Sequence, residues 1–124
     1  MTLDHIGFAV ADFARSRAFF TQALAPLGIG VIMEGPGYAG LGKDGKPQFW
    51  FAGRGNPTPD IHVAFVAENR AQVRAFYEAA RKAGGRDNGP PGIRAHYHPN
   101  YYGAFVLDPD GHNVEAVCHL PEGQ

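Results

Sequence analysis

The sequence predicts an α+β domain in which one unit, a strand, a capped helix and three further strands, occurs twice. Three observations support this prediction. Short apolar runs with alternating faces indicate strands, two longer runs have the helical i, i+3, i+4 spacing, and the pattern of the first half returns in the second. We therefore expect a single domain over residues 1–124, with a first βαβββ module at about 1–55 and a second at about 60–119.

The first module is expected to begin with a strand over 3–10, which places His5 on a face that is otherwise small. Asp12 is a suitable cap for the helix that follows, and Pro26 and Gly28 end that helix. Three apolar runs separated by Gly, Pro and Asp turns then predict a β-meander. Its strands are expected at 30–34, 38–42 and 48–52.

A polar connection rich in Gly and Pro, residues 53–59, leads to the second module. The strand 60–66 carries His62, and Asn69 caps the next helix with Gln72 at the capping-box position. Gly84-Gly85 ends that helix. The remainder is predicted as an irregular segment over 86–100 and two strands over 101–107 and 113–118.

The two modules can be aligned with each other along the sequence. A shift of 57 positions places His5 on His62 without a gap, so the two histidines are expected at equivalent places in their modules. The later Asp-Gly turns repeat at an offset of 66, which places Phe49, or one of its two neighbours, on Glu115.

Composition and charge limit the classes of function. The chain is 44% apolar and 19% charged, as in ordinary globular domains. A net charge of −1 argues against nucleic acid or an anionic membrane as partner, and no apolar run approaches the length of a membrane span. The single cysteine, Cys118, fits a reducing compartment, and the first residues lack the features of a signal peptide. We therefore expect a cytoplasmic protein.

The stretch from Asp108 to Glu115 predicts a tight turn followed by a strand with a carboxylate in its middle. In so apolar a strand, Glu115 is expected to lie at a wet surface or to bind something. Together with His5 and His62 it gives two imidazoles and a carboxylate, which suit a divalent Fe, Mn, Zn, Ni or Co ion. The alternative is that both histidines are satisfied core residues and Glu115 is a surface carboxylate.

The irregular segment and the strand after it contain a second group of candidate residues. Their functional interpretation is a pocket wall near the metal. Proton carriers would be Tyr101, Tyr102 and His96, and substrate contacts would come from Arg94 and His98. The alternatives are an ordered loop with packed aromatics, or a separate metal pair formed by His96 and His98. The remaining candidates, which are expected to be structural or to lie at the rim, are Trp50, His112, Cys118 and His119.

These features resemble the vicinal oxygen chelate superfamily, the group of glyoxalases, bleomycin-resistance proteins and extradiol dioxygenases. The resemblance rests on the paired βαβββ modules, a histidine in the first strand of each, and Asp-Pro-Asp-Gly-His-x-x-Glu at 108–115. It extends from residue 3 to about 118. It implies a half-open barrel around a divalent metal, ligands at His5, His62 and Glu115, and a homodimer whose sites often combine modules of both subunits.

The same resemblance implies a function. By this resemblance the protein is expected to be a metal-dependent enzyme that acts on a small oxygen-rich substrate by Lewis-acid chelation, as a lactoylglutathione-lyase-like or related lyase or isomerase. The remaining ligand position of the family falls near Phe49, which is apolar here. One alternative is an extradiol-type dioxygenase, whose catalytic tyrosine position matches Phe105. Another is a metal-free protein that sequesters a small molecule such as an antibiotic, which would not need His5, His62 and Glu115.

Overall fold

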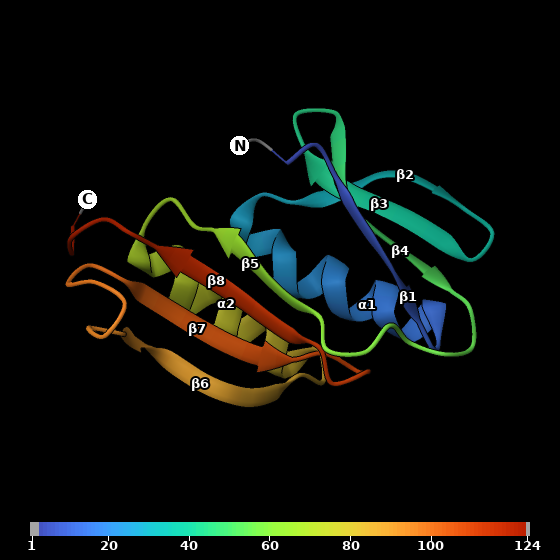
Figure 1. Ribbon diagram of the computed structural model, residues 1–124. Helices are drawn as coiled ribbons and strands as arrows, with labels where there is room; N and C mark the ends of the chain where they lie inside the picture. The colour runs from blue at the N-terminus through green and yellow to red at the C-terminus, as the bar shows by residue number, and fades with distance from the viewer. Residues whose placement is uncertain (1–2, 124) are drawn as a thin grey trace.

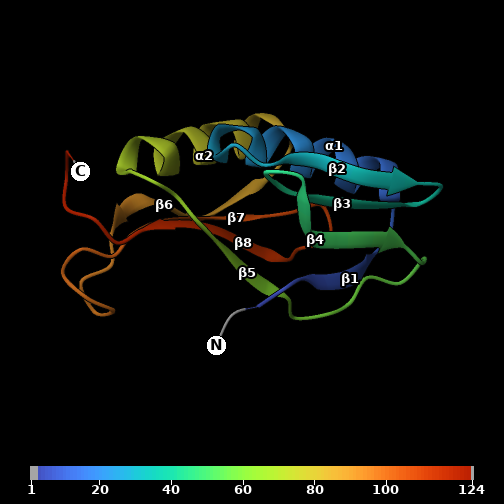
Figure 2. The same cartoon turned by 90° about the horizontal axis from the view of Figure 1, so that it is seen from above.

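The computed structural model describes residues 3–123, which form two four-stranded sheets and two α-helices (Figure 1). The first module contains β1 (Ile6–Val10), α1 (Phe13–Leu24), β2 (Gly30–Gly35), β3 (Tyr38–Lys43) and β4 (Lys46–Gly53), with a 3₁₀ turn at Ala25–Leu27. The second contains β5 (His62–Val66), α2 (Arg70–Lys82), β6 (Arg86–Ile93), β7 (Tyr102–Leu107) and β8 (Asn113–Cys118). Both helices lie on one side of the sheets (Figure 2). Among the described residues, no helix combines the length and apolar character needed to cross a bilayer.

The two sheets have the same topology. Their strand orders are β1-β4-β3-β2 and β5-β8-β7-β6, and the first strand of each module pairs in parallel with the last. A parallel pair needs a long crossover connection, which the helix and the two intervening strands of each module provide. The predicted α+β class with two βαβββ modules is therefore confirmed, and the two sheets remain open, as a half-open barrel requires.

The predicted helix caps are present at the start of both helices. The Asp12 carboxylate accepts a hydrogen bond from the Arg15 backbone N–H at 3.2 Å, and the Asn69 side chain accepts one from Gln72 at 2.8 Å. The Gln72 side chain in turn accepts a hydrogen bond from the Glu68 backbone N–H at 2.8 Å. Each cap satisfies donors that the first turn of a helix leaves unpaired, which fixes where the helices begin.

A cluster of phenylalanines fills the space between the sheets and the helices. Phe20 of α1 lies with its ring centroid 5.0 Å from that of Phe49 and 5.1 Å from that of Phe51. Phe49 also meets Phe65 of β5 edge to face at 5.1 Å, so the core continues from the first module into the second. Burial of one such ring stabilises the fold by roughly 2–3 kcal/mol, and this shared core holds the two sheets together.

The structure differs from the sequence prediction at β6, which occupies most of a segment expected to be irregular. Its residues include Pro90-Pro91 and two glycines, which are unusual in a strand. β6 is an edge strand that pairs only with β7, and its register shifts at Gly89 and again before Gly92. An edge position tolerates prolines because their missing N–H groups face away from the neighbouring strand, so a bulged strand forms where composition indicates a loop.

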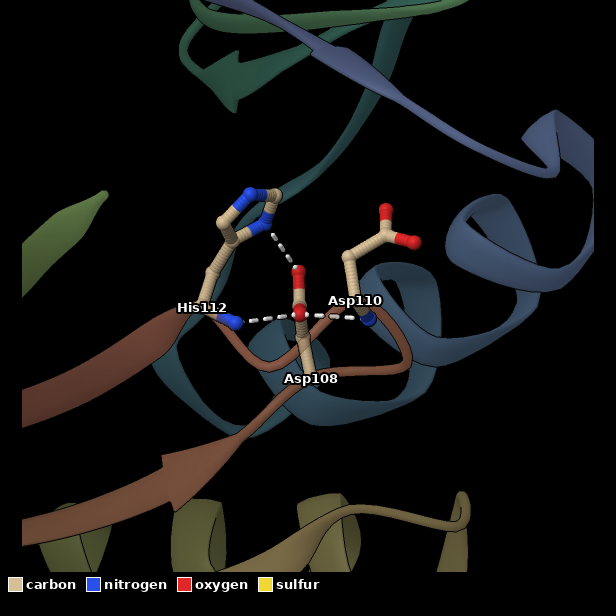
Figure 3. A group of neighbouring side chains, drawn as sticks. All are labelled: Asp108, Asp110 and His112. Carbon is tan, nitrogen blue, oxygen red and sulfur yellow. Dashed lines mark hydrogen bonds and ion pairs between the residues drawn. The ribbon is translucent and has the colours of Figure 1, made fainter. Parts of the chain in front are cut away.

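Asp108 and His112 form a buried clasp at the loop between β7 and β8 (Figure 3). One oxygen of Asp108 accepts backbone N–H groups of Asp110 at 2.9 Å and His112 at 2.8 Å, and the other lies 2.8 Å from His112 Nδ1. His112 Nε2 donates to the Thr58 carbonyl at 2.6 Å. Thr58 also exchanges two hydrogen bonds with Ala9 of β1. The clasp therefore joins the last loop of the second module to residues 53–59, the connection between the modules, and through Thr58 to β1.

We predict that Asp108→Ala lowers the free energy of unfolding by about 3 kcal/mol, because it leaves a buried imidazole and two backbone donors without their acceptor. Asp110→Ala is the matched control. It removes one exposed hydrogen bond, from the Ala11 backbone N–H at 3.2 Å, and should cost less than about 1 kcal/mol. Urea denaturation followed by circular dichroism measures both. Equal losses in the two variants would contradict the role given to the clasp.

Candidate metal and substrate site

His62 and Glu115 meet on the face of the second sheet that points away from the helices. The parallel register of β5 and β8 pairs Ala64 with Glu115 and His62 with Asn113, so the two side chains start on neighbouring strands. His62 Nε2 lies 2.8 Å from Glu115 Oε1. The Glu115 side chain is 1% exposed and that of His62 is 53% exposed. A buried carboxylate therefore lies directly below an accessible imidazole.

Tyr101 completes the surroundings of Glu115. Its hydroxyl donates a hydrogen bond to Glu115 Oε2, the oxygen that does not face His62. Gly103 provides the space for this contact, since a Cβ there would lie 3.2 Å from the Tyr101 ring and 3.4 Å from Glu115 Oε2. Burial, and then the hydrogen bond to and charge of Glu115, raise the pKa of Tyr101 well above its ordinary value of 10.0. The contact with Glu115 thus favours the protonated phenol of Tyr101, which is the form that donates the hydrogen bond.

Tyr102, the other tyrosine considered as a proton carrier, makes its contacts with α2. The guanidinium of Arg70 lies 5.0 Å from the centre of its ring, and Arg74 donates to its hydroxyl at 3.3 Å. Neighbouring positions in an extended chain point in opposite directions, which separates Tyr102 from Tyr101. Of the two tyrosines, the structure brings Tyr101 to Glu115.

The loop before β7 places several of the predicted residues around Tyr101. The ring of His96 lies 4.2 Å from that of Tyr97, which in turn lies 4.7 Å from that of Tyr101. His98 Nε2 lies 2.7 Å from Nδ1 of His119. His98 Nδ1 accepts the Asn100 backbone N–H, so Nε2 is the nitrogen that donates to His119. His96 and His98 thus have separate partners, and His119 lies with the loop at the rim.

Arg94 lies beside a small polar hollow on the same sheet. Its guanidinium donates to the carbonyls of Gly92 at 2.9 Å and Pro90 at 2.8 Å and lies 5.3 Å from the ring of Phe105. The hollow has a volume of about 290 Å³. Its lining residues are Asn88, Gly89, Arg94, His96, Tyr97, Phe105 and Asn113. The ring centroid of Phe105 lies 6.3 Å from that of His62, so the hollow adjoins the His62–Glu115 pair.

His5, the third residue of the predicted ligand set, lies on the first module. Its Nδ1 is 2.7 Å from one oxygen of Asp4, and Lys46 lies 2.7 Å from the other oxygen. Hydrogen bonds from Lys46 and then from His5 lower the pKa of Asp4 to about 2. The His5 side chain is 61% exposed and borders a hollow together with Trp50. Within one chain, His5 is therefore engaged with Asp4, while His62 is engaged with Glu115.

The register of the first sheet corrects one sequence assignment. β1 and β4 pair Gly7 with Trp50, just as β5 and β8 pair Ala64 with Glu115. Trp50, not Phe49, therefore occupies the place of Glu115, and Phe49 is a buried core residue. The prediction placed the two Asp-Gly turns in register, but the loop between β3 and β4 is only residues 44–45 and that between β7 and β8 is residues 108–112. The two Asp-Gly pairs therefore occupy non-equivalent positions in their turns, and aligning them displaces the register by one residue from Trp50, which the prediction allowed as a neighbour of Phe49.

A second group of side chains with metal-binding chemistry was not predicted from the sequence. Ligand atoms of Asp108, Asp110 and His112 lie within 4.8 Å of one another (Figure 3). This arrangement satisfies a minimal distance requirement for a metal site. Its atoms are, however, already paired: Asp108 with two backbone N–H groups and His112, His112 with Thr58, and Asp110 with Ala11. Asp108 and His112 are both buried, whereas His62 is half-exposed, so a metal could reach this group only by opening the loop and breaking these bonds, and we assign it the structural role of the clasp. The spacing Asp-x-Asp-x-His was the available sequence signal.

We predict that Tyr101 ionises well above the ordinary pKa of tyrosine in the folded, metal-free protein. Because its folded-state pKa is raised, Tyr101 contributes stability that is present below about pH 10 and is lost as the pH rises through the folded-state pKa. Absorbance titration of phenolate should show a late component that Tyr101→Phe removes and Tyr97→Phe retains. Ordinary titration of all five tyrosines in the folded protein would contradict the contact with Glu115.

Comparison with known proteins places this geometry in a family. The sequence profile of the Glyoxalase/Bleomycin resistance protein/Dioxygenase superfamily matches residues 2–116. Comparison with curated proteins found no match.

Three solved structures illustrate the similarity. A glyoxalase/bleomycin resistance protein from Albidiferax ferrireducens T118 is 26% identical, with a TM-score of 0.77 and coverage of 94% of this chain and 97% of that one. A glyoxalase/bleomycin resistance protein/dioxygenase family enzyme from Burkholderia phytofirmans PsJN is 22% identical, with a TM-score of 0.72 and coverage of 97% and 100%. A V278E mutant of glyoxalase I from Zea mays is 22% identical, with a TM-score of 0.69, and the match covers 93% of this chain and 43% of that one. The chain belongs to the glyoxalase/bleomycin resistance protein/dioxygenase superfamily.

Proposed function

We propose that the protein is a metal-dependent enzyme that acts on a small, oxygen-rich substrate, as a lactoylglutathione-lyase-like or related lyase or isomerase. The metal ligands in this proposal are His62 and Glu115 of one chain together with His5. The observation that carries the proposal is the 2.8 Å contact between His62 and the buried carboxylate of Glu115. His62 and Tyr101 already partner the two oxygens of this buried carboxylate, and a divalent cation held between His62 and Glu115 would add positive charge that favours the ionised form.

The donor set fits such an ion. An imidazole nitrogen and a carboxylate oxygen are preferred ligands of divalent first-row metals, and the two converge here from rigid neighbouring strands. The half-exposed ring of His62 leaves the site accessible from solvent. When bound, the metal supplies Lewis acidity to substrate oxygens.

The protein's own residues have separate roles around that point. Tyr101 holds a proton beside Glu115 Oε2, so it orients the carboxylate and can donate a hydrogen bond to it throughout the reaction. The polar hollow next to His62 offers amide groups from Asn88 and Asn113 for substrate oxygens. Arg94 makes two bonds to backbone carbonyls, which fix its guanidinium at the edge of the hollow and leave its charge available to an anionic group.

We propose that the third ligand, His5, comes from a second copy of the chain. Members of the superfamily act on small molecules and usually form dimers. The face of β5 that carries His62 is open, with Val66 72% exposed, and Leu3 beside His5 is 62% exposed. Exposed apolar side chains such as these two favour a covering partner. A homodimer that joins these faces can bring His5 of one chain towards His62 and Glu115 of the other.

The test is calorimetric titration of metal-free protein with Mn²⁺, Ni²⁺ and Zn²⁺. Glu115→Gln keeps the size of the side chain and removes its charge, so metal affinity should fall by more than about tenfold, which corresponds to ~1.4 kcal/mol. His62→Ala and His5→Ala should show comparable losses. Each metal should raise the melting temperature of the wild type, because ligand binding to the native state stabilises it.

Asp110→Asn is the control in the same series, since it alters the other group of ligand-type side chains. It should bind metal like the wild type. Equal affinity in the wild type and in all three ligand variants, with a loss in Asp110→Asn, would move the metal to the clasp and refute the proposal. Failure of the wild type to bind any of the three metals would favour a metal-free sequestering protein.

A further inference from the structure

The first module presents an unusually flat aromatic surface where the second module presents Glu115. Trp50 of β4 is paired across the sheet with Gly40 of β3. A Cβ on Gly40 would lie 2.8 Å from Cδ2, Cε2 and Cε3 of the indole, so this glycine has the indole lying directly over it. One face of the indole therefore lies against the backbone of β3 at Gly40. Its other face points away from the sheet, and Trp50 is partly exposed.

Tyr38 extends the same surface, because its ring also lies over a glycine on the neighbouring strand. It is paired with Gly35 of β2, and a Cβ there would lie 2.6 Å from Cζ of the phenol ring. One edge of the Tyr38 ring therefore lies over this glycine, and the residue is 41% exposed. The centroids of the Tyr38 and Trp50 rings are 6.4 Å apart and their planes are inclined by only 26°. The two rings are therefore stacked at a small inclination, and we call the surface formed by Tyr38 and Trp50 the aromatic floor.

The aromatic floor borders a hollow of about 510 Å³, within the range of roughly 300–1,000 Å³ found for small-molecule sites. Gly7 on β1 adds no side chain beside the indole, which keeps the hollow open on that edge. Arg54 is the one charged residue among the described lining residues, and in residues 3–123 no carboxylate lies within ion-pair distance of its guanidinium. The hollow thus combines a stacking surface with one uncompensated positive charge.

We propose that this hollow binds a planar aromatic carboxylate, with its ring stacked on Trp50 and its carboxylate paired with Arg54. A ring lying on an indole face gains contact area and favourable offset stacking, and an arginine recognises a carboxylate through two parallel hydrogen bonds. The hollow adjoins His5, because Trp50 and His5 border a common hollow, but none of the residues that line it belongs to the proposed ligand set, so its occupation can be measured without metal.

Trp50 is the only tryptophan of the chain, so its fluorescence reports on the floor directly. The experiment titrates the full chain, in the presence of a chelator, with 2-naphthoate, and follows Trp50 emission and the heat of binding. Two matched compounds separate the contributions: 2-naphthol has the ring without the carboxylate, and cyclohexanecarboxylate has the carboxylate without an aromatic ring. We expect saturable quenching by 2-naphthoate, binding of 2-naphthol that is about tenfold weaker, and no binding of cyclohexanecarboxylate.

Three variants test the assignment of residues. Arg54→Gln should lower the affinity for 2-naphthoate about tenfold and leave the affinity for 2-naphthol unchanged. Arg15 is an exposed arginine on α1, and Arg15→Gln should change neither affinity. Gly40→Ala should weaken both ring compounds, since its new methyl group forces the indole off the sheet. Circular dichroism checks that each variant is folded.

Several outcomes would overturn the proposal. Equal binding of 2-naphthoate and cyclohexanecarboxylate would show that stacking on the aromatic floor does not contribute to binding. Equal affinity of wild type and Arg54→Gln for 2-naphthoate would show that the positive charge of Arg54 takes no part in binding. Trp50 emission that resists quenching by both iodide and 2-naphthoate, at concentrations where light scattering finds a dimer, would mean that a second copy covers the floor. None of these results depends on metal binding at His62 and Glu115, which is measured separately.

Discussion

The burial of the Glu115 carboxylate is the constraint on which the arrangement of the second module depends. A carboxylate at 1% exposure in the middle of an apolar strand is stable only if both of its oxygens have partners. His62 on the parallel neighbouring strand contacts one oxygen, and Tyr101, just before β7, donates a hydrogen bond to the other. The position of Gly103 follows from the same constraint, because a side chain there would crowd the Tyr101–Glu115 contact.

The two modules share a topology and differ in what their open faces present. At equivalent positions, the second module has a buried carboxylate and the first has the indole of Trp50. Polar donors that converge on one point suit the binding of an ion and of substrate oxygens. A flat ring lying on glycine backbone suits the binding of another flat ring.

Much of the fold could be predicted from the sequence because its signals are local. The helix caps at Asp12 and Asn69 and the alternation in β1, β5 and β8 depend on neighbouring residues only. β6 was not predicted, because its prolines indicate a loop. A strand can contain them only at the edge of a sheet, and the place of a strand in the sheet is not visible in the local sequence.

The site was less accessible to sequence analysis. The pairing of His62 with Glu115 follows from the parallel register of β5 and β8, and that register is a tertiary property. The residue equivalent to Glu115 is Trp50, one of the two neighbours of Phe49 that the sequence analysis allowed, because the Asp-Gly pairs used for the alignment occupy non-equivalent positions in their turns. The clasp of Asp108 and His112 could not be inferred, since its third member, the carbonyl of Thr58, lies far away in the sequence.

The most direct measurement of the central claim is anomalous diffraction from crystals grown with Mn²⁺, with data collected on both sides of the manganese absorption edge. The account predicts an anomalous peak within about 2.0–2.3 Å of His62 Nε2 and of a Glu115 carboxylate oxygen, with His5 of a second copy beside it. A peak among Asp108, Asp110 and His112, or an ordered His62–Glu115 pair without a peak at saturating Mn²⁺, would contradict it.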